Sequence, residues 1–396
     1  MVIKLKIYFF LTTLLCLISQ ESFAGTNINI YQHTQANMLS PTVKNALYRV
    51  YVPNSRSNSV SVIDPTTYQV IQTIHTGMEP QHVVPSYDLQ TLWVLNNKSN
   101  SITAINPVTG KFGQTLAIDD PYNLYFTPNG KWAIVVCEGR EELQFRDPNT
   151  MKLINRLKTG CRGANHMEFS DDGTFAIVTC EHSSQLMKVD LINNKVLGYL
   201  VLNAQKTQLK TAGKTAEINI SADGNIHFQD NSEQSMPQDI RSTADGKLFF
   251  VADMMKDGVA MVDPIRFTQI GFIPTGIGAH AVYPSRDGKL FYVSNRGCHH
   301  SSCGPHGPGS ISVIDPDKKA VIATWTIPKG GSPDMGNVTA NGKELWLSGR
   351  YDSEVYVFDT TTGQLTHRIP VGSGPHGLTV WPQPGRFSLG HTGNMR

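Results

Sequence analysis

Residues 278–295 read GAHAVYPSRDGKLFYVSN, and residues 310–316 read SISVIDP. Apolar and polar residues alternate in both stretches, which is typical of β-strands with one buried face. The Asp287-Gly288 pair in the middle of the first stretch predicts a tight hairpin turn. Asp315-Pro316 predicts another turn at the end of the second. Together, the two stretches predict consecutive antiparallel strands.

The same unit recurs along nearly the whole chain, with a spacing of about 41 to 43 residues where nothing is inserted. A period of this length with four strands matches one blade of a β-propeller. A single blade cannot bury both of its faces, so the blades must close into a ring. The turn that enters each unit occurs seven times, at residues 79–82, 120–123, 163–166, 236–239, 278–280, 332–334 and 374–376.

The hairpin turn inside each unit also has seven copies. Five carry Asp-Gly or Asn-Gly, and Asp88-Leu89 and Pro384-Gly385 are degenerate copies. Residues 47–75 supply three strands without a first one, and residues 376–381 supply a first strand with nothing after it. Pairing these two ends completes a blade and removes an open sheet edge. We therefore predict an all-β, seven-bladed propeller with four antiparallel strands per blade.

The first residues resemble a secretory leader. Lys4 and Lys6 precede an apolar run over 7–18, and small residues at 22 and 24 suit cleavage after Ala24. The run is too short to span a bilayer comfortably. Cys16 raises the alternative of a lipoprotein, but Leu15 stands where lipidation sites favour a small residue. We expect a periplasmic or secreted protein with no transmembrane segment after cleavage.

These observations give a domain plan of residues 1–24 as signal peptide, 25–46 as N-terminal extension, 47–385 as propeller and 386–396 as C-terminal tail. Insertions at about 203–235 and 297–309 interrupt the period. The net charge is +2, so no nucleic-acid surface is predicted. We expect a monomer. Covalent c-type haem is excluded because the chain lacks a Cys-x-x-Cys-His motif.

Residues 92–97 (LWVLNN), 290–295 (LFYVSN) and 374–378 (GPHGL) resemble the repeat of the YVTN-type β-propeller family. The resemblance covers nearly all of the chain after the leader. It implies a seven-bladed propeller, usually in the periplasm or outside the cell, but it does not fix a function. Relatives with this type of repeat include surface-layer proteins, d1-haem propellers and copper-containing reductase domains.

Strand order predicts which face of the propeller carries function. If the strands of a blade are A to D from the channel outward, the D–A and B–C connections lie on one face, here called the top face. Both insertions fall in such connections, and loops on a rigid scaffold are the usual place for function. Of the thirteen histidines, eight are predicted on the top face, at 82, 166, 182, 280, 299, 300, 306 and 376.

The register divides the histidines at the inner-strand entrances into two sets. His280 and His376 stand one residue earlier in the repeat than His82 and His166, and adjacent strand residues face opposite sides. Each ring could bond carbonyls of neighbouring blade turns, or bind a metal or a tetrapyrrole. Our candidate ligand-binding residues are His82, His166, Asp239, His280, Arg296, Arg350 and His376. Our candidate metal ligands are His280, His299, His300 and His376.

Five cysteines remain after the leader. Cys298 and Cys303 lie in a Gly/Pro-rich loop, where a disulfide is the main expectation and soft-metal ligation with His299 and His300 the alternative. Cys161 is expected to pair with Cys137 or Cys180 and leave the other free, although the three could instead bind copper. Arginines near the channel mouth (140, 296 and 350) are either solvated or suited to an anionic ligand.

Three functions remain open from the sequence. The first is a binding protein with a small-molecule, metal or cofactor site at the top mouth of the channel, where copper, zinc or non-covalent haem are the candidate cofactors. The second is a redox or lyase-type enzyme that uses the same face. The third is a scaffold that binds a protein there. The sequence shows no nucleophile elbow, phosphate loop or zinc-protease helix.

Overall fold

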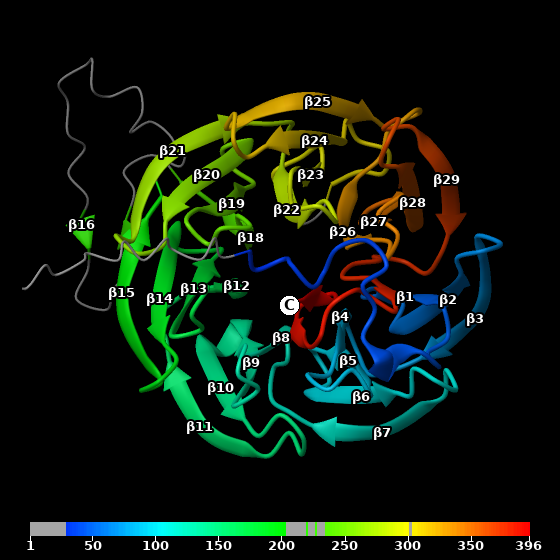
Figure 1. Cartoon of the computed structure of the whole chain (residues 1–396), viewed down its shortest axis with the longest axis horizontal. Coiled ribbons are helices and arrows are strands. Elements are labelled where there is room, and N and C mark those ends of the chain that lie inside the picture. Colours follow the sequence, from blue (N-terminus) through cyan, green and yellow to red (C-terminus); the bar gives the residue numbers. More distant parts are fainter. Residues whose placement is uncertain (1–28, 203–218, 221–225, 228–233, 301–302) are drawn as a thin grey trace, which may run out of the picture.

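The computed structural model describes residues 29–202, 219–220, 226–227, 234–300 and 303–396. The predicted signal peptide at 1–24 lies outside the described residues, as does most of the insertion at 203–235. No helix in the described ranges is long and apolar enough to cross a membrane. The predicted class is confirmed: seven four-stranded antiparallel blades surround a central channel (Figure 1).

Six blades are consecutive in the sequence, and each begins at the channel. Their strands, from the channel outward, are as follows. The first is β4–β7 (Pro80–Pro85, Leu92–Asn96, Ser101–Ile105, Phe112–Ala117), the second β8–β11 (Asn123–Phe126, Ala133–Cys137, Glu142–Arg146, Leu153–Lys158), and the third β12–β15 (Ala164–Phe169, Phe175–Cys180, Gln185–Asp190, Lys195–Val201). The fourth is β18–β21 (Pro237–Ser242, Phe249–Asp253, Gly258–Asp263, Thr268–Pro274), the fifth β22–β25 (Ala279–Pro284, Phe291–Asn295, Ser310–Asp315, Ala320–Thr326), and the sixth β26–β29 (Pro333–Val338, Glu344–Gly349, Glu354–Asp359, Leu365–Pro370).

The seventh blade closes the ring as predicted. Its outer three strands are β1–β3 (Arg49–Asn54, Ser59–Asp64, Gln69–His75), and its innermost strand is β30 (Thr379–Trp381). β30 pairs antiparallel with β1, with Val380 opposite Val50. The smaller elements are η1 (Pro41–Val43), η2 (Glu138–Arg140) and a two-residue pair in the insertion, β16 (Asn219–Ile220) with β17 (Ile226–His227).

Repeated side chains explain why the same hairpins form in each blade. Gly288 has a φ of 70°, a conformation that a tight turn requires and glycine adopts without strain. Leu89, at the equivalent position of a degenerate copy, has a φ of 64°. At the other end of strand B, Asn295 donates from Nδ2 to the hydroxyls of Ser310 and Ser312 on strand C, at 3.1 and 3.0 Å. Asn54 does the same in the closing blade.

The core lies between neighbouring blades. Phe250 of β19 packs edge-on against Phe291 of β23, with ring centroids 5.1 Å apart. The three inner strands of each blade are largely buried, whereas outermost strands such as β3 are exposed along most of their length. Each blade therefore covers the apolar face of the next, which is why the ring must close.

The C-terminal tail, which the sequence left unplaced, fills the channel. We call residues 386–396 the channel hairpin: β31 (Ser388–Gly390) and β32 (Asn394–Met395) pair with each other, and β31 also pairs with β8. The C-terminus lies at the centre of the ring (Figure 1). Pro384-Gly385 therefore does not turn into another blade strand, but leads into this hairpin.

The channel hairpin enters from the bottom face, where the A–B connections lie. Arg396 donates to the carbonyls of Phe169 and Ser170, at 3.0 and 3.1 Å, in one of these connections. The N-terminal extension crosses the same face, because Tyr31 donates to the Ser242 carbonyl at 2.7 Å. The N-terminal extension and the channel hairpin therefore both lie at the bottom of the channel, beside a small cavity lined by Tyr31, Asn337 and His391.

We expect Trp381→Ala to lower the free energy of unfolding by about 3–5 kcal/mol, the usual cost of removing a large buried aromatic side chain. Trp381 is fully buried where β30 meets β1. Urea denaturation followed by circular dichroism measures the change. Ile71→Ala, on exposed strand β3 of the same blade, is the control and should change stability by less than about 0.5 kcal/mol. Equal effects of both substitutions would contradict this account of ring closure.

Candidate functional site at the mouth of the channel

Five of the inner strands, β4, β12, β18, β22 and β26, start at the top face with a β-bulge. The register shifts between Pro80 and His82 in β4, and between Ala279 and Ala281 in β22. A bulge lets neighbouring residues point to the same side. The position of His280 and His376 and the next position, that of His82 and His166, are accordingly both buried. The histidines lie at two levels accordingly: His280 and His376 contact Asp334, whereas His82 and His166 lie one residue further into the channel.

Asp334 is the centre of the upper level, which we call the mouth cluster (Asp334, His280, His376, Arg296 and Arg350). Oδ1 lies 2.7 Å from Arg296 Nη2 and 2.9 Å from His280 Nδ1. Oδ2 lies 2.7 Å from His376 Nδ1 and 4.0 Å from Arg350 Nε. These residues come from three blades, so one buried carboxylate ties the blades together around the mouth.

The mouth cluster holds more positive than negative charge. Burial opposes ionisation of Asp334, but the charged Arg296 guanidinium, with His280 and His376 beside the carboxylate, holds its pKa well below the usual range. Burial lowers the pKa of His280 and of His376, helped by the nearby arginines, so both rings are neutral near pH 7. In the described part of the chain, Asp334 is the only carboxylate paired with Arg296 or Arg350.

Arg350 has hydrogen-bonding capacity to spare. A guanidinium carries five N–H donors, and Arg350 donates to Ser55 Oγ at 3.3 Å while lying 4.0 Å from Asp334. Its side chain is 18% exposed, compared with 7% for Arg296. Arg350 is therefore the cation of the cluster that an incoming ligand can reach.

Two carboxylates approach each other beside the mouth. Glu138 and Glu181 follow Cys137 and Cys180 at equivalent positions of neighbouring blades, and with His182 they form a group whose ligand atoms lie within 4.8 Å of one another. Burial, followed by the charges of Glu181 and Asp120, raises the pKa of Glu138 to about 8. Glu138 is thus largely protonated at neutral pH, which is the state of a general acid.

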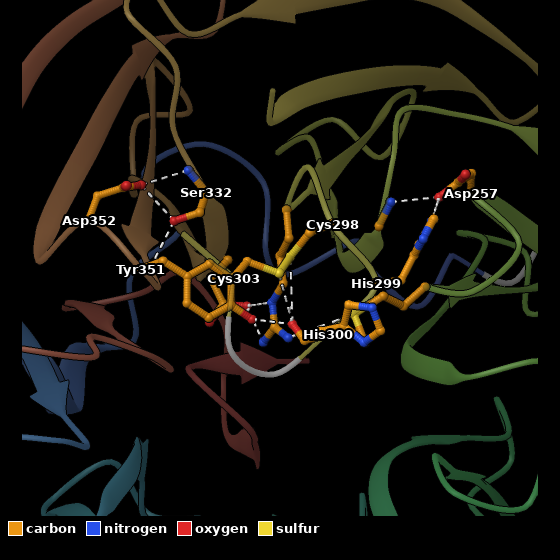
Figure 2. The surroundings of a disulfide bond; sticks show 12 residues. Asp257, Cys298, His299, His300, Cys303, Ser332, Tyr351 and Asp352 are labelled. Carbon is orange, nitrogen blue, oxygen red and sulfur yellow. Dashed lines mark hydrogen bonds and ion pairs between the residues drawn. A yellow bond between two sulfur atoms is a disulfide. The ribbon is translucent and has the colours of Figure 1, made fainter. Parts of the chain in front are cut away.

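The described parts of the loop at 297–309, residues 297–300 and 303–309, contact the blades on both sides of their own (Figure 2). The Cys298–Cys303 disulfide is present, as expected. On one side His299 Nε2 lies 2.6 Å from Asp257 Oδ1. On the other, Tyr351 donates its hydroxyl to the His300 carbonyl at 2.7 Å, and the His306 amide contacts Asp352.

The four histidines predicted as metal ligands are divided between these regions. His280 and His376 belong to the mouth cluster, and His299 Nε2 contacts the Asp257 carboxylate. Among the described residues, side chains close enough to hold one ion form two groups, and neither contains His280, His299, His300 or His376. One group is Glu138, Glu181 and His182; the other is His82, His166 and His391.

The other predicted side chains have mainly structural contacts. Asp239 pairs with Arg241 at 2.8 Å and accepts the amide of Val282 from the next blade at 3.0 Å. Arg140 is exposed and pairs with Asp119. Cys161 forms a disulfide with Cys180 and leaves Cys137 free and buried, which confirms the expected arrangement.

Sequence reasoning missed His391. It lies in a tail outside the repeat, so no register placed it at the channel. The only local signal was the pair of glycines, Gly390 and Gly393, on either side of it. Both have positive φ, as does His391 itself, and together they form the tip of the channel hairpin.

Comparison with known proteins agrees with this architecture. Residues 22–223 and 215–384 match the sequence profile of the YNCE-like beta-propeller family. The chain belongs to that family. No curated protein gives a significant match.

Solved structures share the fold at low sequence identity. Hydrazine synthase of Kuenenia stuttgartiensis superposes with a TM-score of 0.58 at 17% identity, covering 77% of this chain and 91% of that one. A functionally unknown protein from Desulfotomaculum acetoxidans gives 0.59 at 14% identity, covering 84% and 98%. The dihydro-heme d1 dehydrogenase NirN in complex with DHE gives 0.57 at 12% identity, covering 87% and 77%. These likenesses show the fold alone.

We expect the free energy of unfolding to fall as pH is lowered from about 6.5 towards 4. Five fully buried histidines (82, 166, 280, 376 and 391) have lowered pKa values, that of His82 being about 4. Below about pH 6.5 these histidines take up protons in the unfolded chain but not in the folded chain. Each ring therefore lowers the free energy of unfolding by up to about 1.4 kcal/mol per pH unit. Urea denaturation at pH 7, 6 and 5 measures the slope, and equal stability at pH 7 and pH 5 would contradict it.

Asp334→Asn should lower the free energy of unfolding by about 3–5 kcal/mol at pH 7, because it leaves two buried guanidinium groups without a counter-charge. Asp287→Asn, in an exposed hairpin turn, is the matched control and should cost less than about 1 kcal/mol. Chemical denaturation of both variants compares them. A loss at Asp334 no larger than at Asp287 would show that the mouth cluster does not depend on this carboxylate.

Proposed function

We propose that this protein is an exported binding protein that takes an anionic small ligand at the top mouth of its channel. The observation that carries the proposal is the excess of positive charge in the mouth cluster, where two arginines share one carboxylate. An arginine binds carboxylate or phosphate through two parallel N–H donors. Arg350 would make the direct contact, and Arg296, held by Asp334, would supply the field behind it.

The surroundings of the mouth support a ligand site on this face. The channel hairpin fills the channel from below, so a ligand would approach from the top. The disulfide-closed loop adds a rim fixed to both neighbouring blades. Contacts that hold the rim in place before binding lower the entropy that binding must cost.

Export to the periplasm or beyond is part of the same proposal. The leader-like first residues and the two disulfides support it, since disulfides persist in oxidising compartments. A tetrapyrrole with carboxylate substituents is one anionic ligand of suitable chemistry. The NirN structure, a propeller of similar fold in complex with DHE, supports including haem among the ligands to be tested.

A second candidate function is an enzyme that uses the acidic pair beside the mouth. Glu138, with a pKa of about 8, could donate a proton to a ligand bound beside it. This favours lyase-type chemistry, in which one carboxyl acts as an acid. Turnover that is lost in Glu138→Gln, without loss of ligand binding, would distinguish the enzyme from a binding protein.

We expect Arg350→Gln to weaken anion binding at least about tenfold, the effect of losing a charge-assisted hydrogen bond. The probes are citrate, inorganic phosphate and haem, measured by thermal shift, by calorimetry and, for haem, by visible absorption. Arg140→Gln, which removes an exposed arginine of the same face, is the matched control and should bind as the unaltered protein does. If no probe binds the unaltered protein, or if Arg350→Gln binds equally well, the proposal is wrong.

A further inference from the structure

Three imidazoles meet inside the channel, below the mouth cluster. His82 lies in β4, His166 in β12, and His391 at the tip of the channel hairpin, and all three are fully buried. Their ring centroids are 5.8 Å apart for His82 and His166, 5.3 Å for His82 and His391, and 4.4 Å for His166 and His391. One ring nitrogen of each lies within 4.8 Å of one from each of the others.

The Nε2 atoms of these rings have no hydrogen-bond partner. The carboxylate nearest to His391 Nε2 is Asp239, whose Oδ1 lies 3.5 Å away. That oxygen already accepts hydrogen bonds from Arg241 and from the Ile240 amide. Buried polar atoms are nearly always paired, so three unpaired nitrogens at one place need an explanation, such as an ion or an ordered water.

The Nδ1 atoms, in contrast, all have polar neighbours. His82 Nδ1 lies 2.9 Å from the Tyr122 carbonyl, which can only accept, so the proton of this neutral ring is on Nδ1 and the lone pair on Nε2. His166 Nδ1 lies 3.3 Å from the Tyr125 hydroxyl. The Asn123 carboxamide contacts both His166 and His391 at Nδ1, with Nδ2 3.2 and 3.0 Å away.

For His82 this arrangement is the one that metal-ligating histidines commonly have. Such rings donate the N–H that faces away from the metal to a carbonyl, a carboxylate or water, which fixes the ring and its tautomer. The Tyr122 carbonyl already does so for His82. For His166 and His391 the Asn123 carboxamide would have to turn over and offer its oxygen, at the cost of the hydrogen bond that this oxygen now accepts from the Leu124 amide at 3.0 Å. The Tyr125 hydroxyl, which can accept as well as donate, already lies beside His166 Nδ1.

We propose that His82, His166 and His391 bind one divalent transition-metal ion of the zinc or copper class through their Nε2 atoms. Imidazole suits both metals. With nitrogen–zinc bonds of about 2.0–2.1 Å, tetrahedral geometry places neighbouring ring centroids about 5 Å apart. The three observed separations lie on either side of that value. The site lies directly below the anion site proposed at the mouth, with the His82 and His376 ring centroids 4.9 Å apart, but it shares no ligand with it.

A small cavity lies beside one of the three rings. Its volume is about 40 Å³, and it is lined by His391 and Thr392 on the side of Tyr31 and Asn337, but by neither His82 nor His166. This is enough for an ordered water, and three histidines with one water is a common coordination of zinc. Because His391 belongs to the channel hairpin, the ion would fasten the C-terminus to two blades of the ring.

The test uses the full-length exported chain without a polyhistidine tag, freed of metal by a chelator and dialysed. Co²⁺, Zn²⁺ and Cu²⁺ are titrated separately, with calorimetry for each and the visible spectrum for Co²⁺, whose absorption reports tetrahedral coordination. We expect one equivalent of ion to bind. X-ray absorption of the zinc-loaded protein should show at least three imidazole nitrogens. Absence of binding, or fewer than three imidazoles, would overturn the proposal and leave an ordered water as the occupant.

Variants then assign the ligands. His391→Gln should weaken Co²⁺ binding at least about 100-fold and abolish the tetrahedral spectrum, while His75→Gln, on exposed strand β3, should leave both unchanged. Arg350→Gln should also leave them unchanged, which separates this site from the mouth. Co²⁺ affinity that is the same in His391→Gln as in the unaltered chain would overturn the proposal. If His391→Gln does not fold, the imidazole count of the unaltered protein decides.

Discussion

The closing of the ring by β30 against β1 is the contact on which the rest of the structure depends. Each blade buries its apolar side chains against the next, as Phe250 does against Phe291, so an open ring would expose two large apolar faces at once. Because the last inner strand comes from the C-terminus, the chain after Trp381 necessarily starts at the channel. Closure and filling of the channel are therefore performed by one continuous segment.

Closure also places seven inner-strand entrances around one narrow space. Polar residues occupy those entrances. Because they are buried, each charge or hydrogen-bonding group left unpaired there would lower the stability of the fold. The mouth cluster meets this constraint by sharing one carboxylate among four cationic or imidazole side chains. Lower in the channel, the chain instead brings neutral imidazoles together and leaves their Nε2 atoms unpaired. These two levels are the basis of the two sites proposed above, one for an anion at the mouth and one for a cation below it.

Much of the fold and some of the site could be predicted from local sequence. Strand alternation and the Asp-Gly turns are properties of short stretches, and the repeat is found by comparing such stretches. Together they predicted the blade, the ring and its closure. The same period separated His280 and His376 from His82 and His166. The disulfide of Cys298 with Cys303 could be predicted because the two are neighbours in one loop. Local signals failed where contacts join distant segments: nothing near Asp334 in the sequence shows that it would be shared by three blades.

The sequence by itself determined a seven-bladed propeller and predicted its insertions and most of its histidines on one face. It could do so because repeats, turns and strand alternation are patterns within short stretches of residues. Only the tertiary structure decided how those residues combine. It placed His391 beside His82 and His166, paired Cys161 with Cys180 rather than with Cys137, and joined two arginines to one aspartate. The physical reason is that ring closure sets the distances across the channel, and no residue encodes those distances locally.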